Sequence, residues 1–210
     1  MENFTIKLKN KFENEINIIK RVALAGLLVT SGCNSFHQND KTINNTPIEN
    51  VDQFNELPVT FEGIKINGDS TFISSTKEAL SLLAKLPEFE IIKANIAIIE
   101  MSEHSGMDAA LAIPTYGVNQ LTYTSVTEWY ASTIAHDSYH SYLYHKNLYL
   151  NKGKEPNLDT WTGKEAEKEC IGFQLKVLKK ITKRQNLISY LEELKKNPTY
   201  QDIPYEKRNW

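Results

Sequence analysis

The amino-acid sequence predicts an α+β fold, in which a small mixed or antiparallel sheet packs on a helix and a helical C-terminal part follows. Strand-like segments occur before residue 125, and three helix-starting signals follow that point. Segregation of strands and helices along the chain is typical of this class. The chain has 210 residues and is 40% hydrophobic, which is an ordinary globular composition with enough apolar residues for one sizeable core.

The first strand-like segment covers residues 59–69, "VTFEGIKINGD". Its alternating polarity predicts a strand pair or a single edge strand that ends at an Asn-Gly turn. An amphipathic helix follows, with a capping box formed by Ser75 and Glu78 at its start and Pro87 at its end.

Two further segments precede residue 125. Residues 89–101 are dense in β-branched side chains and suit a buried strand, although their periodicity does not exclude a helix. Residues 109–124 contain a proline and a glycine, and we expect an extended chain that forms an edge strand.

The second half predicts three helices. A capping box at residues 125–128 opens a helix that runs to about residue 145, and another at 162–165 opens a helix that runs to about residue 183. Asn186 caps a short final helix, which ends before a proline.

The N-terminal part predicts export. A mostly apolar run, "VALAGLLVTSGC", follows Lys20 and Arg21 and ends at Cys33. Such a run after a positive segment is typical of a signal peptide and is too short to span a bilayer. The alternative is a buried core helix that ends in a Gly-Cys turn. "TSGC" resembles the lipobox of bacterial lipoproteins, which implies an exported chain whose Cys33 is lipidated and anchored to a membrane of the cell envelope.

Three segments follow from this interpretation: a signal peptide over 1–32, the lipidated cysteine with a flexible tether over 33–56, and one domain over 57–210. The tether is rich in Asn, Asp and Thr, which favours a solvated segment. With Cys33 lipidated, only Cys170 remains, so the mature chain could form no internal disulfide. The formal net charge of −2 gives no basic excess, and nucleic acid is not an expected partner.

Two histidines in "STIAHDSYHS" are the first candidate site residues. On a helix, His136 and His140 lie roughly 40° apart around the axis, so both imidazoles leave one face. This spacing lets two ring nitrogens reach one metal ion at about 2.0–2.1 Å. The surrounding helix is apolar on nearly every side, which predicts burial. A buried imidazole needs a partner, and the alternative to a metal is that both rings hydrogen bond to protein groups only.

The later helix offers a carboxylate. The apolar residues of "GKEAEKECIGFQLKVLKKI" have a mean direction roughly 40° from Glu167 and about 120° from Glu169. Glu167 is therefore predicted to face the core, where a bare carboxylate would cost several kcal/mol. Gln174 lies on the same face and needs a hydrogen-bond partner. One metal between the two helices would satisfy both imidazoles and Glu167, with Glu169 as the reserve ligand. The alternative is a solvated first turn of glutamates, favoured by the helix dipole.

Together these residues resemble the zincin metallopeptidases, in the branch whose third ligand is a glutamate on a later helix. The family motif His-Glu-x-x-His is matched by "HDSYH", and its Glu-x-Glu-Ala by "EKEC". The resemblance covers roughly residues 125–180. It implies a zincin-like fold, Zn²⁺ held by His136, His140 and Glu167, and hydrolysis of a peptide or protein substrate by activated water.

Asp137 stands where the family has the glutamate that acts as general base. Aspartate is one methylene shorter, a loss of reach of roughly 1.5 Å, and a general base must lie within about 2.6–3.2 Å of the proton donor. Three hypotheses follow: a lipid-anchored zinc hydrolase with Asp137 as the catalytic base, a non-catalytic envelope lipoprotein that acts as a binding or assembly module, and a structural lipoprotein without metal.

Overall fold

The computed structural model describes residues 59–203. The predicted signal peptide, Cys33 and the tether lie outside these residues. Within the part of the chain that is described, no helix is both long and apolar enough to cross a membrane.

The sheet has five strands in the order β1-β2-β3-β5-β4. The pairs β1–β2 and β4–β5 are antiparallel, whereas β2–β3 and β3–β5 are parallel, so the sheet is mixed. The strands are β1 (Val59–Phe61), β2 (Ile64–Asn67), β3 (Ile98–Met101), β4 (Gly106–Asp108) and β5 (Thr115–Val118). The β1–β2 turn places Gly63 at a φ of 90°, a conformation that glycine adopts without a steric penalty.

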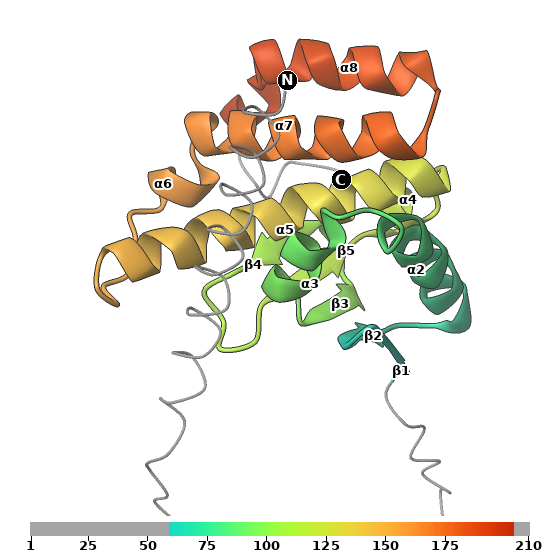
Figure 1. The fold of residues 1–210 in the computed structure, drawn as a ribbon, viewed down its shortest axis with the longest axis horizontal. Helices are drawn as coiled ribbons and strands as arrows, with labels where there is room; N and C mark the ends of the chain where they lie inside the picture. The colour runs from blue at the N-terminus through green and yellow to red at the C-terminus, as the bar shows by residue number, and fades with distance from the viewer. Residues whose placement is uncertain (1–58, 204–210) are drawn as a thin grey trace, which may run out of the picture.

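One long helix, α5 (Thr127–Leu150), runs through the middle of the domain. Figure 1 shows the sheet with α2 and α3 on one side of α5, and α7 with α8 on the other. The remaining helices are α2 (Ser70–Leu83), α3 (Phe89–Asn95), α4 (Gln120–Tyr123), α6 (Asp159–Thr162), α7 (Lys164–Ile181), α8 (Gln185–Lys196) and the 3₁₀ turn η1 (Thr199–Asp202).

The main core lies between the sheet, α2, α3 and α5. It includes Ile99 and Tyr116 from the sheet, Leu80 from α2, and Tyr130 and Ile134 from α5. On its other side α5 packs against α7, where Tyr142 and Leu143 contact Ala166 and Cys170. Because both sides of α5 are covered, side chains that would face water on a surface helix are enclosed here. The sequence predicted this burial, and the α+β class with a helical C-terminal part is confirmed.

Two of the predicted strands need correction. Residues 89–101 form the short helix α3 followed by β3, because Phe89, Ile91 and Ile92 pack as a helix face in the main core. Tertiary packing therefore overrides the β-branched propensity of that segment. Residues 109–124 contribute β5, which is an interior strand because β4 pairs along its outer side.

The predicted helix caps are wrong. Ser75 lies inside α2, whose cap is Asp69: its side chain accepts a hydrogen bond from the Phe72 amide at 2.8 Å. The hydroxyl of Ser125 donates to the Thr122 carbonyl in α4, and the hydroxyl of Thr162 donates to the Leu158 carbonyl just before α6. The helices α5, α7 and α8 begin without a side-chain cap, at residues 127, 164 and 185.

Candidate metal centre

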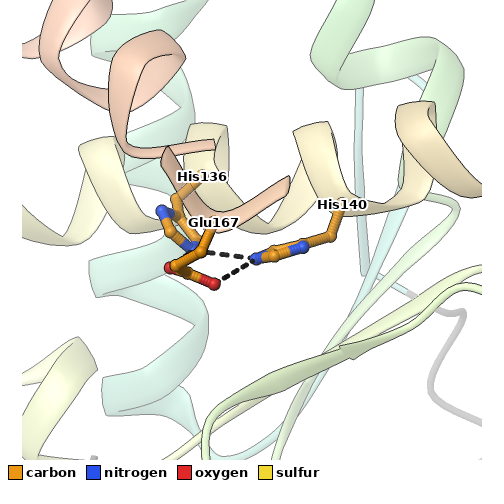
Figure 2. Close-up of side chains that lie close together, drawn as sticks. All are labelled: His136, His140 and Glu167. Atoms are coloured by element: carbon orange, nitrogen blue, oxygen red, sulfur yellow. Dashed lines mark hydrogen bonds and ion pairs between the residues drawn. The ribbon is translucent and has the colours of Figure 1, made fainter. Parts of the chain in front are cut away.

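The candidate site lies where the middle of α5 meets the first turn of α7. His136 and His140 come from α5 and Glu167 from α7, and Figure 2 shows the three side chains pointing toward one another. The corner before α7 is tight: a Cβ at Gly163 would lie 2.5 Å from the Asp159 carbonyl oxygen. A side chain at that position would therefore force the backbone between α6 and α7 to shift.

The donor atoms of the three side chains converge. Nε2 of His136 lies 3.0 Å from Oε1 of Glu167, and Nε2 of His140 lies 3.2 Å from Oε2. The two Nε2 atoms are 3.0 Å apart. The Glu167 side chain is only 3% exposed, so the predicted inward direction of this glutamate is confirmed. Among the described residues, this is the one group of three His, Cys, Asp or Glu side chains that could hold a metal ion.

Hydrogen bonds on the far side of each ring fix the imidazoles. Nδ1 of His140 lies 2.6 Å from the carbonyl oxygen of Trp161, which can only accept, so Nδ1 carries the proton. Nδ1 of His136 lies 3.0 Å from Oε1 of Gln174. The Gln174 amide nitrogen donates to Ser132 Oγ at 3.1 Å, and Ser132 donates to the Trp129 carbonyl, which fixes the orientation of the amide. The partner that the sequence predicted for Gln174 is therefore present.

These hydrogen bonds leave lone pairs on the two Nε2 atoms and on the Glu167 carboxylate that face one another. With Nδ1 protonated, a neutral imidazole directs the lone pair of Nε2 toward the centre. Two such nitrogens and a carboxylate then face one another, which is favourable only when a positive charge joins them. That charge is either a metal ion or additional protons on the rings, so the residues present fit a cation. Outer hydrogen bonds of this kind are typical of histidines that bind metal ions.

The pKa values of the three side chains are shifted in the directions expected of a site that attracts positive charge. Burial lowers the pKa of both imidazoles, but the Glu167 carboxylate outweighs this effect and raises the pKa of His136 and His140 above the usual value. Burial also opposes ionisation of Glu167, yet the two histidines hold its pKa well below the usual range. Glu167 therefore stays ionised and its negative charge dominates the cluster.

Asp137 lies on the side of α5 that faces the sheet. The half-buried carboxylate lies near Tyr116 on β5, whose hydroxyl donates to Oγ1 of Thr133 at 3.2 Å, and the charges of His136, His140 and Glu167 all act on Asp137. Burial raises the pKa of Asp137, while the two histidines oppose this shift. Asp137 thus borders the cluster without belonging to its donor set.

Glu169 and His145 lie outside the cluster. Glu169, the reserve ligand, is exposed and is not part of the cluster. His145 forms a hydrogen bond of 2.8 Å with the Ser141 carbonyl one turn earlier in α5.

Two residues that contact the cluster are not predicted by the sequence. Tyr200 donates a hydrogen bond to Oε1 of Glu167, and the side-chain amide of Gln201 donates to Oε2 at 2.9 Å. Both lie on η1, more than thirty residues after Glu167. No motif or periodicity around them indicates this contact, which arises because α8 turns back along α7 (Figure 1).

Comparison with known proteins gives no relative for the domain. No protein-family model, curated protein or solved structure matches the chain. The functional interpretation therefore depends on the site and its chemistry.

Proposed function

We propose that the chain is a lipid-anchored, zinc-dependent hydrolase that cleaves peptide bonds. The observation that carries the proposal is the cluster of His136, His140 and Glu167, whose ligand atoms all lie within 4.8 Å of one another. Two imidazoles and one carboxylate form the protein ligand set of a well-known class of catalytic zinc sites, in which a fourth position stays open. The choice of a peptide substrate rests on the resemblance of "HDSYH" and the later glutamate to the zincin metallopeptidases.

Each residue has a defined role in this proposal. His136, His140 and Glu167 would hold the ion, and Gln174 and the Trp161 carbonyl would keep the two rings in the binding tautomer. When bound, Zn²⁺ supplies a water of lowered pKa and polarises the carbonyl under attack. Asp137 would accept the proton that the attacking water gives up and pass it to the leaving amine.

A second candidate keeps the metal but lacks catalysis. Asp137 is shorter than the glutamate of the family motif, and it is not one of the side chains whose ligand atoms converge. Both features favour an envelope lipoprotein that uses the metal to stabilise a binding or assembly module. The two candidates differ in whether the zinc-loaded chain turns over a substrate.

Activity on a generic unfolded protein separates the candidates. We expect the full-length chain loaded with zinc to cleave such a substrate, and Asp137→Asn to lower the rate by about 10²–10⁴-fold while zinc stays bound. Asp159→Asn is the matched control, because Asp159 is an exposed aspartate on α6, and it should keep the activity. A zinc-loaded chain without activity would favour the binding module, whereas an Asp137→Asn variant as active as the original chain would show that Asp137 is not the catalytic base.

The membrane anchor is a separate part of the proposal. "TSGC" at residues 30–33 would direct acylation of Cys33, so that membrane lipid is a partner and the domain lies at the surface of a bacterial membrane. We expect a labelled fatty acid to be incorporated into the full chain expressed in bacteria and to be absent from Cys33→Ser. Equal labelling of both chains would show that Cys33 is not the site of acylation.

A further inference from the structure

The Glu167 carboxylate has a symmetrical set of neighbours. Each of its oxygens has one imidazole nitrogen on the α5 side and one hydrogen-bond donor from η1: His136 and Tyr200 at Oε1, and His140 and Gln201 at Oε2. A carboxylate offers about four lone-pair sites. The two donors from η1 therefore use one site on each oxygen and leave the sites that face the histidines for a cation.

The segment that carries these donors is fixed to the domain. Pro198 is buried, and Tyr200 packs against the cluster of apolar side chains between α7 and α8. The carboxylate of Asp202 lies 2.7 Å from Nζ of Lys164 at the start of α7. These contacts hold η1 beside the turn of α7 on which Glu167 lies.

We propose that Tyr200 and Gln201 are positioning residues of the metal centre, whose hydrogen bonds orient the Glu167 carboxylate toward the site between His136 and His140. This inference rests on the proposed metal site. A glutamate side chain has three rotatable bonds. Apart from Tyr200 and Gln201, the polar partners of the Glu167 carboxylate within the described residues are the two imidazoles, which would themselves bind the ion. The donors from η1 are neutral, so they orient the carboxylate without replacing the missing positive charge. The C-terminal segment is thus part of the site.

The proposal predicts a specific loss of metal affinity. Removing a hydrogen-bond partner of a metal ligand typically weakens binding by about 10–100-fold. We expect this loss in full-length Tyr200→Phe and, independently, in Gln201→Leu. Matched controls are Tyr190→Phe, which removes the hydroxyl of an exposed tyrosine on α8, and Gln185→Leu, which removes an exposed amide at the start of α8. Both controls should bind zinc as the original chain does.

Competition between the protein and a chromophoric chelator for Zn²⁺ measures the affinity. The absorption spectrum of the Co²⁺-loaded protein reports the coordination geometry, which a merely structural role of η1 would leave unchanged. We expect weaker binding and an altered cobalt spectrum for both η1 variants, with metal-free stability close to that of the controls. Zinc affinity and spectra equal to those of Tyr190→Phe and Gln185→Leu would overturn the inference.

The same titration separates this inference from the proposed function. If the original chain binds no zinc and His140→Ala behaves identically, the metal site itself is wrong and the positioning role is wrong with it. If the original chain binds zinc and His140→Ala does not, but both η1 variants bind normally, only the positioning role is wrong.

Discussion

Helix α7 is involved with two buried carboxylates whose surroundings differ. It supplies the lysines that pair with Glu88, and it carries Glu167 itself. Glu88 stands before α3, is 1% exposed, and has two lysines of α7 beside Oε1: Lys180 and, at 3.2 Å, Lys176. Its Oε2 is buried and has no hydrogen-bond partner within residues 59–203. Glu167 has partners at both oxygens, but these are two imidazoles, a hydroxyl and an amide.

The difference lies in where the positive charge comes from. At Glu88 the chain supplies permanent cations, on flexible side chains that are 48% and 39% exposed. At Glu167 the chain supplies groups that are rigid and neutral at their usual protonation state, arranged around a common point. A buried carboxylate is stable only with a compensating charge. The charge of Glu88 is therefore compensated by the chain itself, whereas the charge of Glu167 requires a proton or a metal ion from solution.

The largest expected effect is the dependence of stability on zinc. A ligand present at 100 times its Kd stabilises the folded chain by about 2.7 kcal/mol. We expect thermal unfolding of the full-length chain to shift upward with zinc and to return on addition of EDTA, and Glu167→Gln to show no shift. Glu169→Gln, an exposed glutamate two residues away on the same helix, is the matched control and should respond as the original chain does. If zinc still stabilises Glu167→Gln, the claim that Glu167, unlike Glu88, requires a cation from solution is wrong.

A smaller effect is expected at Glu88. Glu88→Gln removes the charge that the two lysines compensate, and we expect a loss of about 1–2 kcal/mol in the free energy of unfolding at pH 7, measured with urea in the presence of EDTA. The partly exposed lysines keep this below the cost of breaking a fully buried pair. The zinc response of this variant should be unchanged. Loss of zinc binding in Glu88→Gln would mean that the two carboxylates are not independent.

The stabilisation that Glu88 provides should depend on pH in a defined direction. Burial tends to raise the pKa of Glu88, but hydrogen bonds from Lys180 and Lys176 outweigh burial and lower it below the usual 4.5. The stabilisation by Glu88 is therefore fully present above the unfolded pKa and is lost as the pH falls through the lower folded pKa. The stability difference between the original chain and Glu88→Gln should shrink below about pH 4.5, and a difference that is constant down to acid unfolding would contradict this assignment.

The site was largely predictable because it depends on periodicity. The four-residue spacing of His136 and His140 fixes a common face, and the apolar side of α7 points Glu167 rather than Glu169 inward. Tyr200 and Gln201 were not predictable, since their contact depends on how α8 turns back. The path of a chain after a loop is a tertiary property that local pattern does not encode.

The fold was predictable in class and less so in detail. The long helices α5 and α7 were both predicted: α7 has one buried face that leaves a periodic pattern, whereas α5 is apolar on nearly every side. The Ser/Thr-x-x-Glu pattern failed as a cap signal at Ser75 because a better cap, Asp69, lies six residues earlier at the true start of α2. It failed at Ser125 because the hydroxyl donates to the Thr122 carbonyl instead. In each case a competing hydrogen bond, which the sequence pattern does not rank, decided the outcome.

Metal analysis of the purified full-length chain tests the central claim most directly. After exposure to zinc and removal of the excess, the account predicts about one zinc ion per chain, and none for Glu167→Gln. A chain that retains no metal, with His136 and His140 carrying the compensating charge as protons, would contradict it.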